Sequence, residues 1–158
     1  MRHLLILLSL FLFSFTIFSC SSSSDDGSKS TDNTTTTDNT TTSTWTKQLG
    51  TSSEDMGFGV TTDSSGNIYV TGITERGLDG NNNSGYDDIF LVKYNSSGTK
   101  QWTKQMGTSS DDRGNSVTTD SSGNIYLTGS TEGGLDGNTN SGDEDIFLMK
   151  YNSSGIGQ

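Results

Sequence analysis

The chain has 158 residues, of which 27% are hydrophobic, with 20 glycines, no proline and one cysteine. The formal net charge of −10 disfavours a nucleic-acid partner, because affinity for phosphate requires clustered lysines and arginines. The single histidine, His3, lies in an N-terminal leader. A histidine-containing catalytic triad and a histidine-ligated metal site are therefore excluded from the chain that remains once the leader is removed.

Residues 1–19 have the pattern of a signal peptide: Arg2 and His3 precede an apolar run from Leu4 to Phe18, which is shorter than a membrane span. The run ends in Ile-Phe-Ser-Cys20, which resembles a bacterial lipobox. Cys20 has no second cysteine with which to form a disulfide. We therefore expect cleavage before Cys20 and its acylation, as by palmitate. The predicted location is that of an exported lipoprotein, anchored at the outer membrane or cell surface.

Residues 20–44 comprise the lipidated cysteine and a polar Ser/Thr/Asn/Asp segment. Between Ser21 and Thr44 there is no apolar side chain, so this segment cannot bury enough surface to offset the entropy of ordering. We expect a disordered tether that separates the anchor from a folded domain.

From Trp45 onward the sequence repeats itself without a gap, as residues 45–101 and 102–158, and about three quarters of the aligned positions are identical. Such self-similarity indicates a repeat architecture. Each copy predicts about four short strands, which in the first copy are 45–49, 57–62, 67–74 and 88–94. Asp63 to Asn67 and Asn95 to Gly98 predict turns, with Gly66 at a positive φ. The fourth predicted strand is apolar on both faces, as in a strand that is covered on both sides.

Two segments, Asp63-Ser-Ser-Gly-Asn-Ile-Tyr-Val-Thr-Gly72 and Asp88-Ile-Phe-Leu-Val-Lys-Tyr-Asn-Ser-Ser-Gly98, recur at 120–129 and 145–155. They resemble the SBBP family, the seven-bladed beta-propeller repeat of exported bacterial proteins. The resemblance covers residues 45–158. It implies an all-β fold of two four-stranded blade-like repeats and an extracytoplasmic location, and it implies no enzymatic activity.

Two blades are fewer than the four to eight or so that close a propeller, so a lone pair leaves apolar faces and strand edges open. One expectation is an oligomerising partial propeller, for example a ring of chains. The other is a fragment of a larger propeller, because the sequence stops where a third tryptophan would follow Gln158. The rival fold is a small β-sandwich formed from both repeats, which needs no partner.

The loops at 78–85 and 135–142 are candidates for calcium binding. Asp79, Asn81 and Asn83, with their counterparts Asp136, Asn138 and Asn140, follow the spacing of the first three ligands of an EF-hand loop. Ser84 and Phe90 replace the glycine and the bidentate glutamate of that pattern. A polar connection between strands therefore competes with a calcium site, and no other cofactor is indicated.

Adjacent acidic residues occur as Glu54-Asp55, Asp87-Asp88, Asp111-Asp112 and Glu144-Asp145. Neighbouring residues of a strand point to opposite faces, so these are not paired carboxylates of a glycosidase site, and we expect solvated loop charge. Trp45 and Trp102, with the tyrosines of the strands, offer stacking surfaces for sugars. Packing between blades is the alternative that the strand positions favour.

We expect a surface-anchored, non-enzymatic repeat lipoprotein that serves as a binding or scaffold module. Its expected partners are the membrane, through the N-terminal lipid, further blades or copies of itself, and an extracellular protein or glycan. The alternatives are a truncated part of a carbohydrate-active or lyase-type propeller enzyme, and a gene fragment without a function of its own.

Overall fold

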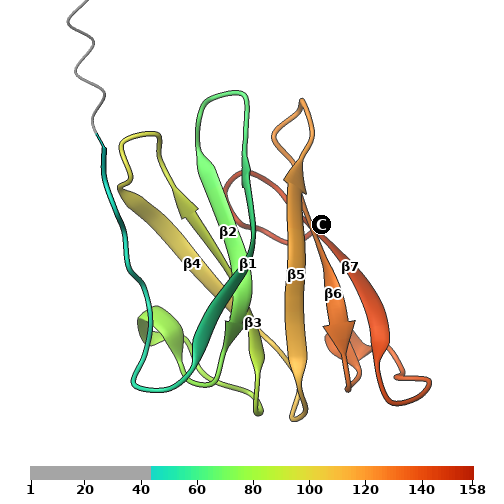
Figure 1. Ribbon diagram of the computed structural model, residues 1–158. Coiled ribbons are helices and arrows are strands. Elements are labelled where there is room, and N and C mark those ends of the chain that lie inside the picture. Colours follow the sequence, from blue (N-terminus) through green and yellow to red (C-terminus); the bar gives the residue numbers. More distant parts are fainter. Residues whose placement is uncertain (1–43) are drawn as a thin grey trace, which may run out of the picture. The chain divides into compact units, whose positions relative to one another are not determined.

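The computed structural model describes residues 44–158, drawn in colour in Figure 1. The predicted signal peptide, Cys20 and all of the predicted tether before Thr44 lie outside the described residues. Within the described range, no helix is long and apolar enough to cross a membrane.

The first sheet contains four antiparallel strands in the order β1-β2-β3-β4. They are β1 (Asp55–Thr62), β2 (Ile68–Thr74), β3 (Asp88–Tyr94) and β4 (Lys100–Met106). A short 3-10 turn, η1 (Leu78–Gly80), lies in the connection from β2 to β3. Of the four strands predicted in the first copy, the last three therefore correspond to β1, β2 and β3.

The second sheet repeats this arrangement with three strands, in the order β5-β6-β7. They are β5 (Asp112–Thr119), β6 (Ile125–Thr131) and β7 (Asp145–Tyr151), and η2 (Leu135–Gly137) lies before β7. The register of β5, β6 and β7 is that of β1, β2 and β3, including the bulge in the first strand of each sheet.

The boundary between sheets is offset by one strand from the boundary between sequence repeats. β4 consists mostly of the first residues of the second repeat, yet it pairs with β3 of the first repeat, with Lys104 opposite Leu91. The predicted strand at 45–49 is wrong, because this segment has no strand partner. Its counterpart becomes β4 through pairing with a preceding sheet, and no sheet precedes Trp45 among the described residues. The second sheet has three strands rather than the expected four, because within residues 44–158 no further copy of the β4 sequence follows β7.

Asp63 closes the hairpin between β1 and β2. Its carboxylate accepts hydrogen bonds from two backbone amides of the turn at 2.9 and 3.0 Å, from the Asn67 side chain at 2.8 Å and from the Tyr69 hydroxyl at 3.0 Å. Gly66 has a φ of 76°, which confirms the predicted turn and which residues with a side chain rarely adopt. Asp120 accepts the equivalent four bonds in the second copy.

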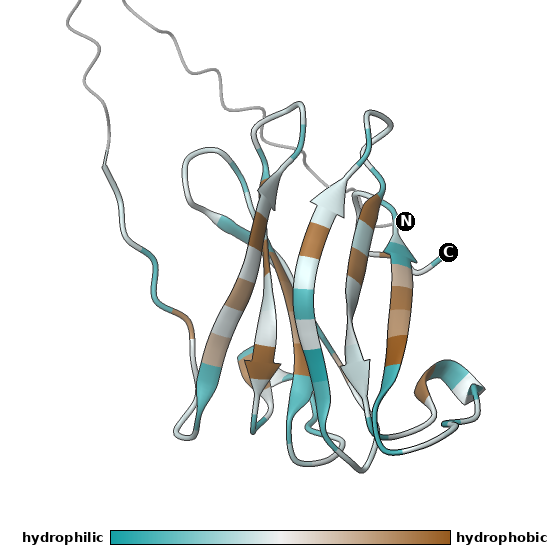
Figure 2. Ribbon diagram, turned by 45° about the vertical axis from the view of Figure 1, so that its right-hand side comes forward, coloured by the Kyte–Doolittle hydropathy of each residue, from teal (hydrophilic) through white to brown (hydrophobic). Residues whose placement is uncertain are grey.

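Each sheet has two faces, because successive side chains of a strand point to opposite sides. We call one the front face, marked by Ile68, Val70 and Val92, and the other the back face, marked by Tyr69, Ile89 and Leu91. Figure 2 shows apolar residues as bands along the strands of both sheets. The corresponding residues of the second sheet are Ile125, Leu127 and Met149 on the front face and Tyr126, Ile146 and Leu148 on the back face.

The core lies between the back face of the first sheet and the front face of the second. Its buried residues are Tyr69, Ile89, Leu91, Val117, Ile125, Leu127 and Leu135. The two sheets stack front to back, with β5 against β1, β2 and β3. The front faces of both sheets therefore point in the same direction along the stack. The expected all-β class is confirmed, and the two antiparallel sheets are consistent with neighbouring propeller blades.

Candidate functional site

The two candidate calcium loops are occupied by contacts within the protein. Asp79, at a φ of 53°, forms an ion pair with Lys100 and accepts a hydrogen bond from Thr103. Burial acts to raise the pKa of Asp79, but the hydrogen bonds and the charge of Lys100 outweigh burial and lower it. The Asn81 amide donates to the Leu78 carbonyl at 2.7 Å.

Asn83 accepts a hydrogen bond from the side chain of Gln105 at 3.1 Å. In the second loop, Asn138 donates to the Leu135 carbonyl at 2.8 Å, and Asn140 accepts from the Gly142 amide at 2.8 Å. Asp136 repeats the positive φ, at 51°. Among the residues that the structure describes, no cluster of three His, Cys, Asp or Glu side chains is arranged to hold a metal ion.

The acidic pairs lie where a strand begins. The second residue of each pair accepts hydrogen bonds from the loop that precedes its strand or from a neighbouring strand. Asp55 accepts hydrogen bonds from the Thr51 and Thr74 hydroxyls at 3.0 and 2.6 Å, and Asp112 accepts from the hydroxyls of Thr108 and Thr131. The fully buried Asp88 accepts from Gln105 at 2.9 Å through one oxygen. Its other oxygen has no partner.

Three acidic residues surround Arg113 where the two sheets meet. The guanidinium lies 3.5 Å from Asp87, 3.6 Å from Asp111 and 3.9 Å from Glu144. Burial, followed by the negative charge of Asp111, raises the pKa of Asp87. Arg113 occupies the repeat position of Met56, so this ion cluster exists at one junction alone among the described residues.

The two tryptophans differ in their packing. Trp102 and Met106 of β4 pack against the core between the sheets, and the rings of Trp102 and Tyr69 lie 6.1 Å apart. Trp45 lies on the other side of the first sheet and is 40% exposed. Trp102 thus packs between the two sheets as its strand position predicted, whereas Trp45 is partly exposed and lies outside any strand.

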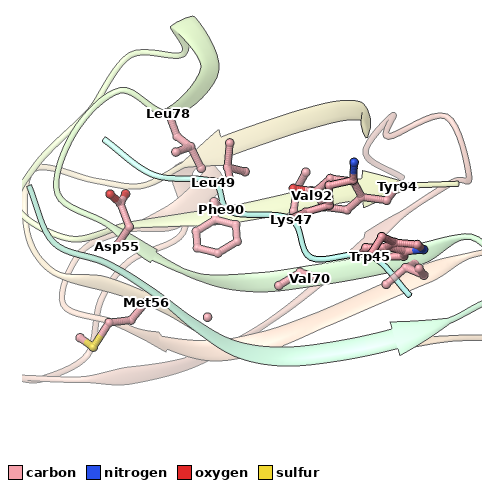
Figure 3. A pocket seen from close by; sticks show the side chains of 12 residues that line it. Trp45, Lys47, Leu49, Asp55, Met56, Val70, Leu78, Phe90, Val92 and Tyr94 are labelled. Carbon is pink, nitrogen blue, oxygen red and sulfur yellow. The ribbon is translucent and has the colours of Figure 1, made fainter. Parts of the chain in front are cut away.

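An apolar cavity of about 230 Å³ is lined by the segment at 45–49 and by the front face of the first sheet, against which Leu49 packs. Figure 3 shows Leu49, Leu78 and Phe90 at one end of this cavity. The equivalent face of the second sheet is covered by the first sheet. The front face of the first sheet is therefore covered incompletely, and Val60 is 68% exposed where its counterpart Val117 is 6% exposed.

The other uncovered surface is at β7, which pairs with β6 along one side. Along its other side the described residues supply a bridge from Tyr151 to Gly157 and a bond from the Gln158 amide to the Lys150 carbonyl. On its back face, Ile146 is 91% and Leu148 74% exposed, whereas their counterparts Ile89 and Leu91 are 0% exposed. We call this side of β7, with Ile146 and Leu148, the open edge.

The exposure of Ile146 and Leu148 was not predicted, because their sequence context is that of a buried strand. The comparison of the two repeats contains the signal for it. β4 covers the edge of β3, and within residues 44–158 no third copy of the β4 sequence follows β7.

A family model, SBBP beta-propeller repeat, matches residues 44–74 and again residues 101–136. Both matches begin just before a Trp-Thr-Lys-Gln segment and extend through the first two strands that follow it. No curated protein matches the chain. The sheet order and the front-to-back stacking agree with these two matches, and residues 44–74 and 101–136 are identified as SBBP beta-propeller repeats.

Proposed function

We propose that this chain is a lipid-anchored, non-enzymatic β-propeller repeat module of the bacterial cell surface that binds a protein partner through its open edge. The observation that carries the proposal is the contrast between two equivalent strands. Leu91 in β3 is fully buried and Leu148 in β7 is 74% exposed, although both lie in an Asp-Ile-Phe-Leu sequence.

An unpaired edge strand offers backbone N–H and C=O groups to an added strand. Exposed apolar side chains on the adjacent face give such an added strand a surface to bury. Ile146 and Leu148 provide this surface beside the free side of β7. A protein segment in extended conformation is therefore the class of partner that fits the open edge.

The use of the polar side chains supports a non-enzymatic role. Asp63 and Asp120 accept the same set of turn hydrogen bonds in both copies. Asp55 and Asp112 likewise contact the loops before their strands and a threonine of the neighbouring strand. These carboxylates make the same contacts in both copies and stabilise the repeat unit. A catalytic residue would instead be expected to differ in its contacts from its counterpart in the other copy.

The surface location rests on the sequence, through the signal-peptide pattern and Cys20. Growth of cells with a labelled fatty acid tests it: the wild-type chain should incorporate label and sediment with membranes. The Cys20→Ser variant should do neither. Incorporation of label into the Cys20→Ser variant would refute acylation at this residue.

Binding is tested in living cells with a photoreactive amino acid at position 148, and with the same residue at position 86 as a matched control. Tyr86 is 75% exposed and lies in the loop before β3. We expect protein adducts from position 148 and few from position 86. Equal adduct formation at the two positions, or none at position 148, would contradict a binding role for the open edge.

A further inference from the structure

The segment Trp45–Leu49, which we call the N-terminal segment, lies where an outer strand of a preceding sheet would lie. A Cβ on Gly98 would be 2.8 Å from the Trp45 ring, and a Cβ on Gly155 would be 3.2 Å from the Trp102 ring. Each tryptophan therefore packs under the last turn of the sheet that follows it. Trp102 belongs to β4 of the preceding sheet, whereas Trp45 has no sheet of its own.

The N-terminal segment and the open edge have the sequences of two strands that pair within the chain. The segment reads WTKQL where β4 contains WTKQM, and β7 reads DIFLMKY where β3 reads DIFLVKY. β3 and β4 are paired along their length. The segment and β7 lie at opposite ends of the described part of the chain (Figures 1 and 2), so one copy cannot pair its own two ends across the two sheets.

We propose that the partner of the open edge is a second copy of this chain, which adds its N-terminal segment to β7 as the missing fourth strand. This inference rests on the proposed binding function of the open edge. The register follows from the pairing of Leu91 with Lys104 and of Phe90 with Gln105. Leu148 of one copy lies opposite Lys47 of the next, and Phe147 lies opposite Gln48.

The side-chain bonds that attach β4 to its sheet can be repeated between copies. Gln105 accepts from the Leu78 amide at 2.7 Å and donates to Asp88 at 2.9 Å, and Thr103 donates to Asp79. The counterparts are all present in the sequence: Gln48 and Thr46 in the N-terminal segment, and Leu135, Asp145 and Asp136 beside β7.

Two bonds that join the sheets can also be repeated between copies. The Thr119 hydroxyl donates to the Thr62 carbonyl at 3.0 Å, and Lys93 donates to the Ser153 carbonyl at 2.9 Å. Between copies the donors are Thr62 and Lys150, and the acceptors are the carbonyls of Thr119 and Ser96.

Gly57 supports the same packing. At its counterpart Gly114, a Cβ would lie 2.4 Å from the Thr71 hydroxyl and 2.8 Å from Ile89 of the neighbouring sheet. At Gly57 the nearest atom is 3.8 Å away, on Val70, so nothing in its own copy requires a glycine. In a docked pair of copies, Thr128 and Ile146 of the second copy occupy the places of Thr71 and Ile89. They leave no room for a Cβ at position 57, which explains the glycine there.

The exposed apolar faces are complementary in the same way. On the front face of the first sheet, the cavity beside the N-terminal segment and the exposed Val60 are not covered by another sheet. Ile146 and Leu148 of a second copy would cover this face. The Arg113 ion cluster is not repeated, because its counterpart is Met56. Such head-to-tail contact is heterologous, and it generates a closed ring when the rotation per copy closes. Propellers with about four to eight blades correspond to about two to four copies.

Disulfide capture tests the register in the full-length chain, with Cys20→Ser as background so that the introduced thiols are the only ones. Chains carrying Lys47→Cys are mixed with chains carrying Leu148→Cys in mild detergent and oxidised. The control mixture combines Lys47→Cys with Tyr86→Cys, whose side chain is as exposed as that of Leu148. Circular dichroism verifies that each variant retains its β-structure.

We expect roughly ten-fold more mixed disulfide dimer from the Lys47/Leu148 mixture than from the control, because a disulfide requires Cβ atoms about 3.5–4.5 Å apart and directly opposed strand residues approach this distance. Equal yields from the two mixtures, or no dimer from the Lys47/Leu148 mixture, overturn the inference. If photoreactive residues at position 148 nevertheless capture a different protein in cells, the binding function stands and the second copy is the wrong partner.

Discussion

Substitution of Leu91 by alanine tests the packing between the two sheets. Leu91 is 0% exposed and belongs to the core cluster that includes Tyr69, Ile125 and Leu127. The change deletes three carbon groups, each worth about 0.8 kcal/mol on burial, and the cavity that remains adds to this loss. We therefore expect the free energy of unfolding to fall by about 3 kcal/mol and the melting temperature to fall by roughly 10–15 °C.

Leu148→Ala is the matched control, because it is the same change at the same repeat position. Leu148 is 74% exposed, so in the dissociated chain the substitution should change stability by less than about 0.5 kcal/mol. Both variants are compared with the wild type by thermal denaturation, followed by circular dichroism at low protein concentration. A loss below about 1 kcal/mol for Leu91→Ala, or equal losses for the two variants, would refute the described packing of the sheets.

Three further changes probe the repeat unit. Asp63→Ala removes the acceptor of four hydrogen bonds in the first hairpin and should lower the free energy of unfolding in urea by about 1–2 kcal/mol; an unchanged urea midpoint would contradict this role. Burial acts to raise the pKa of Asp63, but the hydrogen bonds of the turn together outweigh burial and lower this pKa. The pKa of Asp120 is lowered as well, chiefly by the hydrogen bond from the Asn124 side chain. The stabilisation from these hydrogen bonds is therefore present above the unfolded pKa of about 4 and is lost as the pH falls through the lower folded values, so acid titration of the melting temperature should show a decline that is smaller in the Asp63→Ala variant. Gly114→Ala places a Cβ 2.4 Å from the Thr71 hydroxyl and should cost about 1–3 kcal/mol, whereas Gly57→Ala, measured in the same way on dissociated chains, should cost less.

The strands and turns that depend on neighbouring residues were predictable from the sequence. The alternation in 67–74, the apolar run in 88–94 and the Asp-Ser-Ser-Gly-Asn turn gave β2, β3 and the hairpin close to their observed bounds. Met56, Phe58 and Tyr86 are exposed, in keeping with their replacement by Arg113, Asn115 and Asp143 in the second copy. These features depend on residues near one another in the chain, so a single sequence contains the information.

What the sequence did not give is the partner of each strand. Trp45 to Leu49 and Trp102 to Met106 are nearly identical in sequence, yet one is an unpaired segment and the other is β4. The difference lies in whether a sheet precedes the segment, and residue propensity carries no such information. Likewise, Ile146 and Leu148 have the sequence of core residues, and their exposure follows from the absence of a covering strand among the described residues.

The pairing of the N-terminal segment with the open edge of a second copy is tested most directly by the molar mass of residues 44–158 in solution. This mass is determined by light scattering after size exclusion over a range of protein concentrations. The account predicts a β-structured assembly of about two to four copies, which dissociates when Leu148 is replaced by aspartate. A folded chain that remains monomeric at high concentration would contradict it, because the open edge and the N-terminal segment would then be stable without each other.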